Sequence, residues 1–355
     1  MQVLRDREDK LAEINHISMG KYIGTNKRLV NFDIAKAICI ILVVIGHYSP
    51  DLQPGWYASN HDFIYSFHMP LFMFVSGYIY ITFKKEESYG HFLMKKVRRL
   101  MIPYFVTSIL IVSIKLITEG NAYVQNPVTV MSYLKVFYSP EAGYFLWFIW
   151  ALWWMFVIVP ILKSKKLRLI GFAIAFVLHY LPFSITRVFC FEQARVMMMY
   201  FMLGVVSYDY KEYCLRFARL LAIPIFALFA GCEYVYLSNE FRGGQVYACY
   251  LNPYLGIAVI LYISTWLANK RDLYLSKALC YMAPSTYIIY LFHTTFEGFA
   301  KAIVHKIPWI VTAENGWMFI AGALFVITSG VVGPVLLHRY VLVRSRITKF
   351  LFGLK

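Results

Sequence analysis

Residues 31–48 form an apolar run that carries three ionisable side chains: Asp33, Lys36 and His47. A helix of about 20 mostly apolar residues crosses a bilayer, and an ionisable residue inside such a helix is costly enough to suggest a functional site. Asp33 and Lys36 are three residues apart, so they can meet on one helix face. His47 follows Lys36 by roughly three helical turns and projects to the same side. The spacing therefore predicts one helix with a charged pair near one end and an imidazole near the other.

The remaining sequence is also strongly apolar. Of its 355 residues, 60% are hydrophobic and 15% are charged, whereas a soluble domain carries about 25% charged residues. The mean hydropathy is +0.57. We predict an all-α, polytopic integral membrane protein with about ten transmembrane helices. The predicted spans are 31–48, 62–82, 100–118, 144–162, 167–181, 196–209, 219–237, 247–268, 279–300 and 316–340.

The net charge is +16, and the distribution of the positive charges along the chain fits the predicted topology. Most lysines and arginines fall in alternate loops, and residues 83–99 are the richest of these. Basic loops stay on the cytoplasmic side of a membrane, so both termini are predicted to be cytoplasmic and no nucleic-acid partner is needed. We divide the chain into a cytoplasmic tail (1–28), a membrane domain (29–345) and a second tail (346–355). The polar N-terminus predicts no signal peptide.

Two further predicted spans carry histidine. His68 lies one turn inside the outer end of the second span, just before Pro70, which is expected to kink or end a helix. Ser76 is a small residue that allows close helix approach. His293 and Glu297 are four residues apart in the ninth span, so Glu297 is expected to orient His293 or stabilise its charge. A histidine inside a membrane is otherwise often a packing residue.

The basic segment 95–99 has two interpretations. In the first, its positive charge only keeps this loop on the cytoplasmic side of the membrane. In the second, Lys96, Arg98 and Arg99 hold a phosphate at the inner face of the membrane, with Lys96 and Arg99 on one helix face. Trp147 opens a tryptophan-rich span and is likewise interpreted either as part of an interfacial belt or as a stacking surface for substrate. The six cysteines show no metal-ligand spacing, so no zinc site, other metal or disulfide framework is expected.

These motifs together resemble the acyltransferase family 3 membrane O-acyltransferases, which modify bacterial surface carbohydrates. The resemblance rests on five pieces in order: Asp33-x-x-Lys36 with Val-Val-Ile-Gly-His47, Phe67-His-Met-Pro-Leu-Phe72 with Ser76-Gly77-Tyr78, Arg98-Arg99-Leu100 before Pro103-Tyr104, Trp147-Phe148, and Tyr290-Leu-Phe-His293. It extends over most of the chain.

The resemblance implies an enzyme of the bacterial inner membrane that moves an acyl group, usually acetyl, from coenzyme A to a sugar hydroxyl. His47 falls on the essential histidine of the family, and Lys36 falls where many members have arginine. Lys96 and Arg99 fall on the family's RxxR, with lysine in the first place, which weakens a bidentate contact there. The chain is expected to lack the extracytoplasmic hydrolase-like domain that some members carry. A homodimer or a separate glycan-assembly partner is compatible with it.

We interpret the candidate residues through this reaction. His47 would be the base or would carry the acyl group, Asp33 would neutralise Lys36, and His293 would assist. Acetyl-CoA would be held by Lys36, Lys96, Arg98 and Arg99, while His68, Ser76, Trp147 and Glu297 would meet the carbohydrate acceptor. The alternatives are a transporter or flippase for a polar or lipid-linked solute, against which no inverted repeat is found, and a membrane module that handles amino acids.

Overall fold

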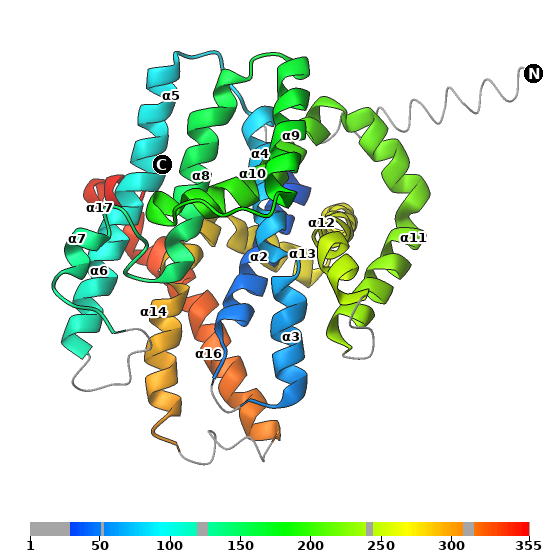
Figure 1. The fold of residues 1–355 in the computed structure, drawn as a ribbon. Helices are drawn as coiled ribbons and strands as arrows, with labels where there is room; N and C mark the ends of the chain where they lie inside the picture. The colour runs from blue at the N-terminus through cyan, green and yellow to red at the C-terminus, as the bar shows by residue number, and fades with distance from the viewer. Residues whose placement is uncertain (1–28, 51–52, 119–126, 239–243, 308–315, 355) are drawn as a thin grey trace, which may run out of the picture.

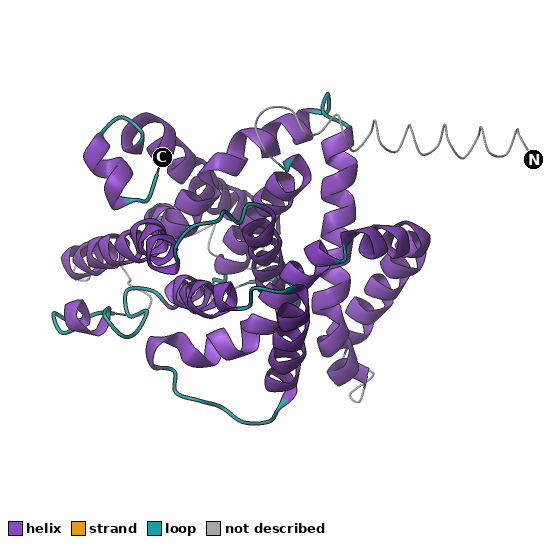
Figure 2. Cartoon of the chain, turned by 90° about the horizontal axis from the view of Figure 1, so that it is seen from above, coloured by secondary structure: helices purple, strands orange, loops and turns teal. Residues whose placement is uncertain are grey.

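The computed structural model describes residues 29–50, 53–118, 127–238, 244–307 and 316–354. Only helices and loops occur in this part of the chain (Figures 1 and 2). The all-α prediction is therefore confirmed for these residues.

The first half of the chain contains α2 (Val30–His47), α3 (Gly55–Tyr65), α4 (His68–Thr82), α5 (Tyr89–Lys96), the π-helix η1 (Val97–Met101), α6 (Ile102–Thr118), α7 (Ser132–Lys135), the 3₁₀ turn η2 (Tyr144–Leu146), α8 (Trp147–Ile158) and the 3₁₀ turn η3 (Val159–Ile161). The second half contains α9 (Lys165–Tyr180), the 3₁₀ turn η4 (Val188–Cys190), α10 (Phe191–Asp209), α11 (Lys211–Leu237), α12 (Gly244–Asn269), α13 (Tyr274–Met282), the 3₁₀ turn η5 (Ala283–Ser285), α14 (Thr286–Val304), α16 (Gly316–Leu336), the π-helix η6 (Leu337–Leu342) and α17 (Arg346–Leu351).

The α2 helix lies in the middle of the bundle, between α6 and α14 on one side and α11 and α12 on the other (Figure 1). It packs against α3, α4, α12, α13, α14 and α16. Many of its buried residues are small or β-branched, such as Ala35, Val44 and Gly46, which lets neighbouring helices approach closely. The apolar run of residues 31–48 therefore forms the central helix of the fold.

Among the residues that the structure describes, eight helical stretches are long and apolar enough to cross a membrane. They are Val30–His47, Gly55–Thr82, Tyr89–Thr118, Tyr144–Ile161, Val188–Asp209, Leu220–Leu237, Tyr250–Asn269 and Gly316–Leu342. The other two predicted spans, 167–181 and 279–300, correspond to α9 and to α13–α14 and are not among the eight. The α9 helix has only 16 residues and begins with lysines, and α14 carries polar and charged side chains within its 19 residues.

The second predicted span is two helices. It divides at Ser66 and Phe67, between α3 and α4. Pro70 stands in the first turn of α4, where its missing N–H leaves no hydrogen bond unmade. The expectation that Pro70 ends a short outer segment is confirmed, and His68 becomes the first residue of the second helix.

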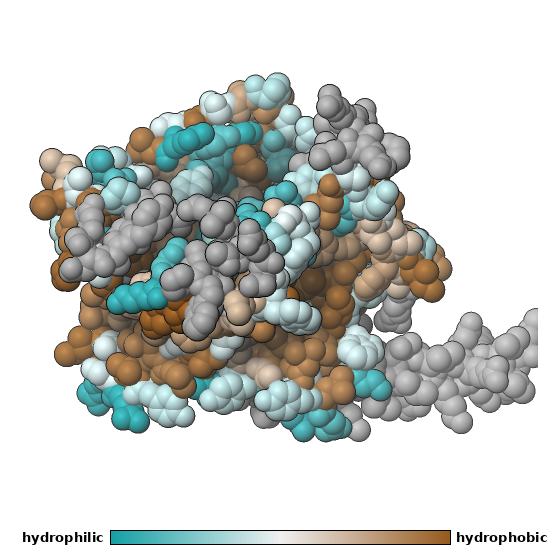
Figure 3. Space-filling model, turned by 90° about the horizontal axis from the view of Figure 1, so that it is seen from below, coloured by the Kyte–Doolittle hydropathy of each residue, from teal (hydrophilic) through white to brown (hydrophobic). Residues whose placement is uncertain are grey.

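Glycines allow α4 and α10 to cross in close contact. A Cβ atom on Gly77 would overlap the carbonyl oxygen of Phe201, and one on Gly204 would overlap the carbonyl oxygen of Phe74. Away from such contacts, large apolar side chains face outward: Ile223 on α11 is 83% exposed. Figure 3 shows broad hydrophobic areas on the face seen from below, as expected for helices surrounded by lipid.

Candidate active site

The C-terminal end of α2 and the middle of α14 bring two histidines together. The ring centroids of His47 and His293 lie 4.9 Å apart. The ring of Phe145, from the turn before α8, lies 6.0 Å from His47 and 5.1 Å from His293. Three segments that are far apart in the sequence therefore meet at one cluster of rings.

Backbone hydrogen bonds fix the tautomer of His293. Its Nδ1 atom lies 3.1 Å from the carbonyl oxygen of Ile289 and 2.9 Å from that of Tyr290. Carbonyl oxygens only accept, so Nδ1 carries the proton and Nε2 of the neutral ring is an acceptor. The residue is fully buried, and its Nε2 has no described partner. His293 thus holds a free lone pair in the interior of the bundle.

Glu297 lies one turn after His293 and is 1% exposed. Its Oε1 atom has no described hydrogen-bond partner. The side chain rests against Gly330 of α16, where a Cβ atom would lie 2.9 Å from Cγ and 3.0 Å from Oε1 of Glu297. The same Cβ would lie 2.9 Å from Val44 of α2. The structure describes no hydrogen bond from Glu297 to His293, so the orienting role of Glu297 stays a prediction.

Lys301 continues this face of α14 by one more turn. Its Nζ atom lies 3.4 Å from the carbonyl oxygen of His47 and 5.5 Å from the ring centroid of Tyr48. A cation at the C-terminal end of a helix is stabilised by the unpaired carbonyl groups there. Sequence reasoning placed Lys301 in an outer loop. Its position four residues after Glu297 and eight after His293 was the signal that could have found it.

Tyr290 holds the turn that carries Phe145. The Tyr290 hydroxyl donates to the carbonyl oxygen of Phe145 across 2.6 Å, and the two rings lie 5.8 Å apart. Phe145 itself is missed by sequence reasoning. It lies in one of many apolar runs, and no sequence pattern distinguishes a phenylalanine beside the histidines from any other buried phenylalanine.

His68 lies at the start of α4, where the thiol of Cys39 of α2 donates to its carbonyl oxygen across 3.1 Å. Its Nδ1 atom lies 2.8 Å from the carbonyl oxygen of Ile64, so Nδ1 carries the proton here too. Its ring lies 4.7 Å from that of Tyr65. Tyr65 in turn packs on Gly46, where a Cβ would lie only 2.8 Å from Cε2 of the tyrosine. Tyr65 therefore packs between the ring of His68 and the end of α2.

Comparison with known proteins identifies the family of the chain. A family model described as an acyltransferase domain matches residues 29–339. The chain belongs to this acyltransferase family. The matched range contains His47, Phe145, His293, Glu297 and Lys301.

Two curated relatives are similar to part of this acyltransferase-family chain. Nodulation protein NolL of Mesorhizobium japonicum is 29% identical over 209 residues, which are 57% of this chain and 50% of the relative. Nodulation protein NolL of Sinorhizobium fredii is 29% identical over 204 residues, which are 55% of this chain and 49% of the relative. The chain thus spans about half the length of the curated relatives it matches. No solved structure gave a significant match.

The other end of α2 carries the predicted ion pair. Lys36 Nζ lies 2.8 Å from Oδ1 of Asp33, which confirms the contact predicted from their spacing. One turn away, Phe32 stacks on Tyr78 of α4 with ring centroids 4.2 Å apart. The pair thus lies beside the packed contact of α2 with α4, and the two ends of α2 differ in chemistry as expected.

The predicted phosphate clamp is divided by the π-helix η1. Lys96 Nζ lies 3.5 Å from the ring centroid of Phe156 and 5.3 Å from that of Phe92. Arg98 and Arg99 are exposed, within the wider turn of η1. Within the described residues no carboxylate lies within 4 Å of Lys96. The ring of Tyr80 also lies near Phe156, with centroids 5.8 Å apart. The Tyr80 hydroxyl has no described hydrogen-bond partner. The joint role of Lys96 and Arg99 stays a prediction.

Lys95 differs from Lys96 because it is paired. Its Nζ atom lies 2.7 Å from Oε2 of Glu87, in the loop between α4 and α5. The hydrogen bond from Lys95 lowers the pKa of the Glu87 carboxyl. Of these two lysines, Lys96 is therefore the one without a described carboxylate partner.

Ser76 and Trp147 are both half-buried. The Trp147 ring lies 6.2 Å from that of Phe148, and no contact of either residue with the two histidines is described. Two surface hollows lie elsewhere: one of about 450 Å³ along α16, beside Leu324 and Ser329, and one of about 430 Å³ beside His338. Among the described residues, no group of three or more metal-ligating side chains is found.

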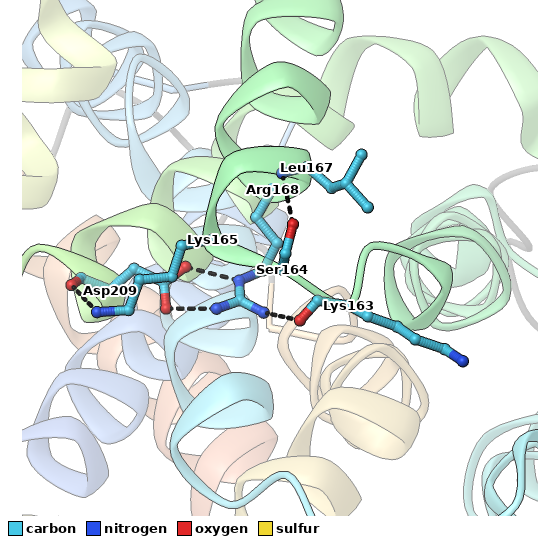
Figure 4. A network of polar contacts seen from close by, with 6 residues as sticks. All are labelled: Lys163, Ser164, Lys165, Leu167, Arg168 and Asp209. Atoms are coloured by element: carbon cyan, nitrogen blue, oxygen red, sulfur yellow. Dashed lines mark hydrogen bonds and ion pairs between the residues drawn. The ribbon is translucent and has the colours of Figure 1, made fainter.

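A buried ion pair that sequence reasoning missed joins α9 to α10. Arg168 Nε lies 2.6 Å from Oδ2 of Asp209, and Nη2 lies 2.7 Å from Oδ1 (Figure 4). Nη1 donates to the carbonyl oxygen of Lys163 across 3.0 Å. The two side chains are only 9% and 3% exposed. This bidentate pair fixes how α9 meets the end of α10, away from the histidines.

Proposed function

We propose that this chain is a membrane O-acyltransferase that moves an acyl group, acetyl in the simplest case, from coenzyme A to a hydroxyl of a cell-surface or exported carbohydrate. The observation that carries the proposal is the 4.9 Å approach of the His47 and His293 rings, with a free acceptor nitrogen on His293. The family supports acyl transfer. The donor and the acceptor are part of the proposal.

His47 is the base in this proposal. As the substrates bind, the two rings move closer and His293 Nε2 accepts the N–H of His47, because catalytic hydrogen bonds tighten in the substrate complex. The opposite nitrogen of His47 is then a basic lone pair. Histidine suits this role because its ordinary pKa lies near neutrality.

The reaction balances with one proton relay. The sugar hydroxyl gives its proton to His47 as its oxygen attacks the thioester carbonyl carbon. The new C–O bond forms, the C–S bond breaks, and the thiolate of coenzyme A takes the proton back from His47. The transient oxyanion needs a donor or cation, and the candidates are the ammonium group of Lys301 and the side chain of His68.

The nucleotide phosphates of coenzyme A would bind near Lys96. An unpaired ammonium and a partnerless tyrosine hydroxyl, that of Tyr80, support an anion there. Lys36, Arg98 and Arg99 would add positive charge at the same side. The pantetheine arm, which is long and thin, would then extend along α2 toward His47.

The proposed topology has ten spans and cytoplasmic termini in the bacterial inner membrane. Residues 29–345 would form the membrane domain between tails 1–28 and 346–355. In this arrangement α9 and α14 would be the ninth and tenth spans, in addition to the eight apolar helical stretches. The excess of lysine and arginine in alternate loops supports this orientation.

His47→Ala, with His305→Ala as a control, tests the proposal. His305 is an exposed histidine at the end of α14. In membranes supplied with radiolabelled acetyl-CoA, His47→Ala should abolish transfer to glycan, and His305→Ala should keep it, at equal expression. Mass spectrometry of the surface glycans should show the matching loss of one acetyl unit. Full activity of His47→Ala would rule out His47 as the base.

A further inference from the structure

The hollow of about 430 Å³ beside η6 is separate from the histidine cluster. It is lined by residues from α13, from η5, from the π-helix and from just after it: Tyr281, Pro284, His338, Arg339, Tyr340 and Val343. A π-helix widens the turn and often occurs at functional sites. None of these residues has a role in the proposed acyl transfer.

Arg339 is held in one orientation at this hollow. Its Cζ atom lies 3.4 Å from the ring centroid of Tyr281, and its Nη2 atom donates to the carbonyl oxygen of Tyr281 across 2.5 Å. No carboxylate lies within 4 Å of Arg339 in the part of the chain that the structure describes. A guanidinium group that is fixed in place and unpaired is well suited to bind phosphate, since its remaining N–H groups are already oriented.

His338 adds a second polar side chain to the lining. Its Nδ1 atom lies 2.8 Å from the hydroxyl oxygen of Ser285, which is fully buried. Either group can donate in this hydrogen bond, so the second ring nitrogen, Nε2, is a donor in one tautomer of His338 and an acceptor in the other. Two polar side chains, Arg339 and His338, and two tyrosine rings thus surround one shallow hollow.

The surroundings of the hollow favour lipid as the source of the phosphate. Tyr281 and Tyr340 are 54% and 55% exposed, and the apolar side chains of Leu336 and Val341 beside them are 49% and 53% exposed. Exposed apolar residues at the end of a membrane helix meet lipid, and tyrosine is typical of the headgroup level. Basic pockets at the cytoplasmic ends of spans bind anionic headgroups.

We propose that this hollow binds the phosphate group of an anionic phospholipid, with the Arg339 guanidinium as its main ligand. The lipid would bridge the α13–α14 junction and the end of α16. The site does not depend on the acyl-transfer proposal.

Lipid retention by the purified full-length protein tests this site. The protein in detergent is titrated with phosphatidylglycerol or phosphatidylcholine, and bound lipid is counted by native mass spectrometry. Wild type should retain phosphatidylglycerol in preference to phosphatidylcholine. Arg339→Gln should weaken phosphatidylglycerol binding about tenfold, the effect of losing one charged hydrogen-bonded contact. Arg344→Gln is the matched control, because Arg344 is exposed and lies outside the lining.

Two further arms keep the test decisive. Inorganic phosphate and coenzyme A are added to the wild-type protein with bound phosphatidylglycerol, and neither should displace it. Displacement by either would assign the hollow to a soluble phosphate ligand and overturn the lipid proposal. Equal retention of the two lipids by wild type, or equal loss in Arg339→Gln and Arg344→Gln, would also overturn it. If Arg339→Gln fails to fold, Arg339→Lys is used instead: it keeps the charge but loses the planar set of N–H donors, so it should bind phosphatidylglycerol more weakly than wild type, and binding equal to wild type would overturn the proposal.

Discussion

The Nζ atom of Lys301 lies 3.4 Å from the carbonyl oxygen of His47, so a side chain of α14 holds the last residue of α2. The carbonyl groups at the end of a helix have no partner within it. Lys301 supplies one, and α14 also carries His293. The distance between His47 and His293 therefore depends on the contact of Lys301 in α14 with the end of α2.

Replacing Lys301 with Met should lower kcat about tenfold, because a hydrogen bond to a charged group contributes about 1.5–3 kcal/mol and the His47 backbone would lose its partner. The KM for acetyl-CoA should change little, since Lys96 is at the other end of α2. Steady-state kinetics in proteoliposomes would separate the two parameters.

Lys306→Met is the control for this change, since Lys306 is exposed near the end of the same helix segment. Lys301→Arg keeps the charge and should recover part of kcat. A kcat of Lys301→Met equal to that of Lys306→Met would remove Lys301 from the site.

Gly330→Ala should impair the site from a third helix. The added Cβ would lie 2.9 Å from Val44 and 3.0 Å from Oε1 of Glu297, so one of these neighbours must move. Overpacking of this kind costs about 1–3 kcal/mol. Gly298→Ala is the matched control, because a Cβ there meets nothing within 4 Å. The Tm of thermal unfolding and the acyl-transfer rate should both fall in Gly330→Ala and stay unchanged in Gly298→Ala. Equal values for the two variants would contradict close packing at Gly330.

The general character of the fold was predictable from the sequence because membrane helices are recognised by composition alone. The Asp33–Lys36 pair followed from spacing on one helix. The break before Pro70 followed from the chemistry of proline. In each case the property belongs to a local segment, which is what a pattern along the chain can report.

The contacts between helices were less predictable. His47 and His293 were both singled out, but their 4.9 Å approach depends on how α2 packs on α14. Phe145 and Lys301 were missed for the same reason. The π-helix η1 also altered the i,i+3 relation assumed for Lys96 and Arg99, because a π turn contains more residues than an α turn.

Tyr290→Phe should loosen the turn that carries Phe145. The lost hydrogen bond leaves the carbonyl oxygen of Phe145 without this partner, at a cost of about 1–3 kcal/mol, and the ring that contacts both histidines gains freedom. We expect kcat to fall several-fold. Tyr287→Phe is the control, because the buried hydroxyl of Tyr287 on the same helix has no described partner. A larger effect in Tyr287→Phe would contradict this role for Tyr290.

Arg168→Leu should destabilise the protein without acting on the histidines. The change leaves the Asp209 carboxylate, 3% exposed, without its bidentate partner. Removing one member of a buried ion pair costs about 3–5 kcal/mol, whereas replacing both with apolar residues is often neutral. Thermal unfolding in detergent should therefore show a marked fall in Tm for Arg168→Leu and substantial recovery in the double variant Arg168→Leu/Asp209→Leu. Equal losses in the single and double variants would mean that the packing of α9 on α10, rather than the uncompensated charge, sets the stability at this contact.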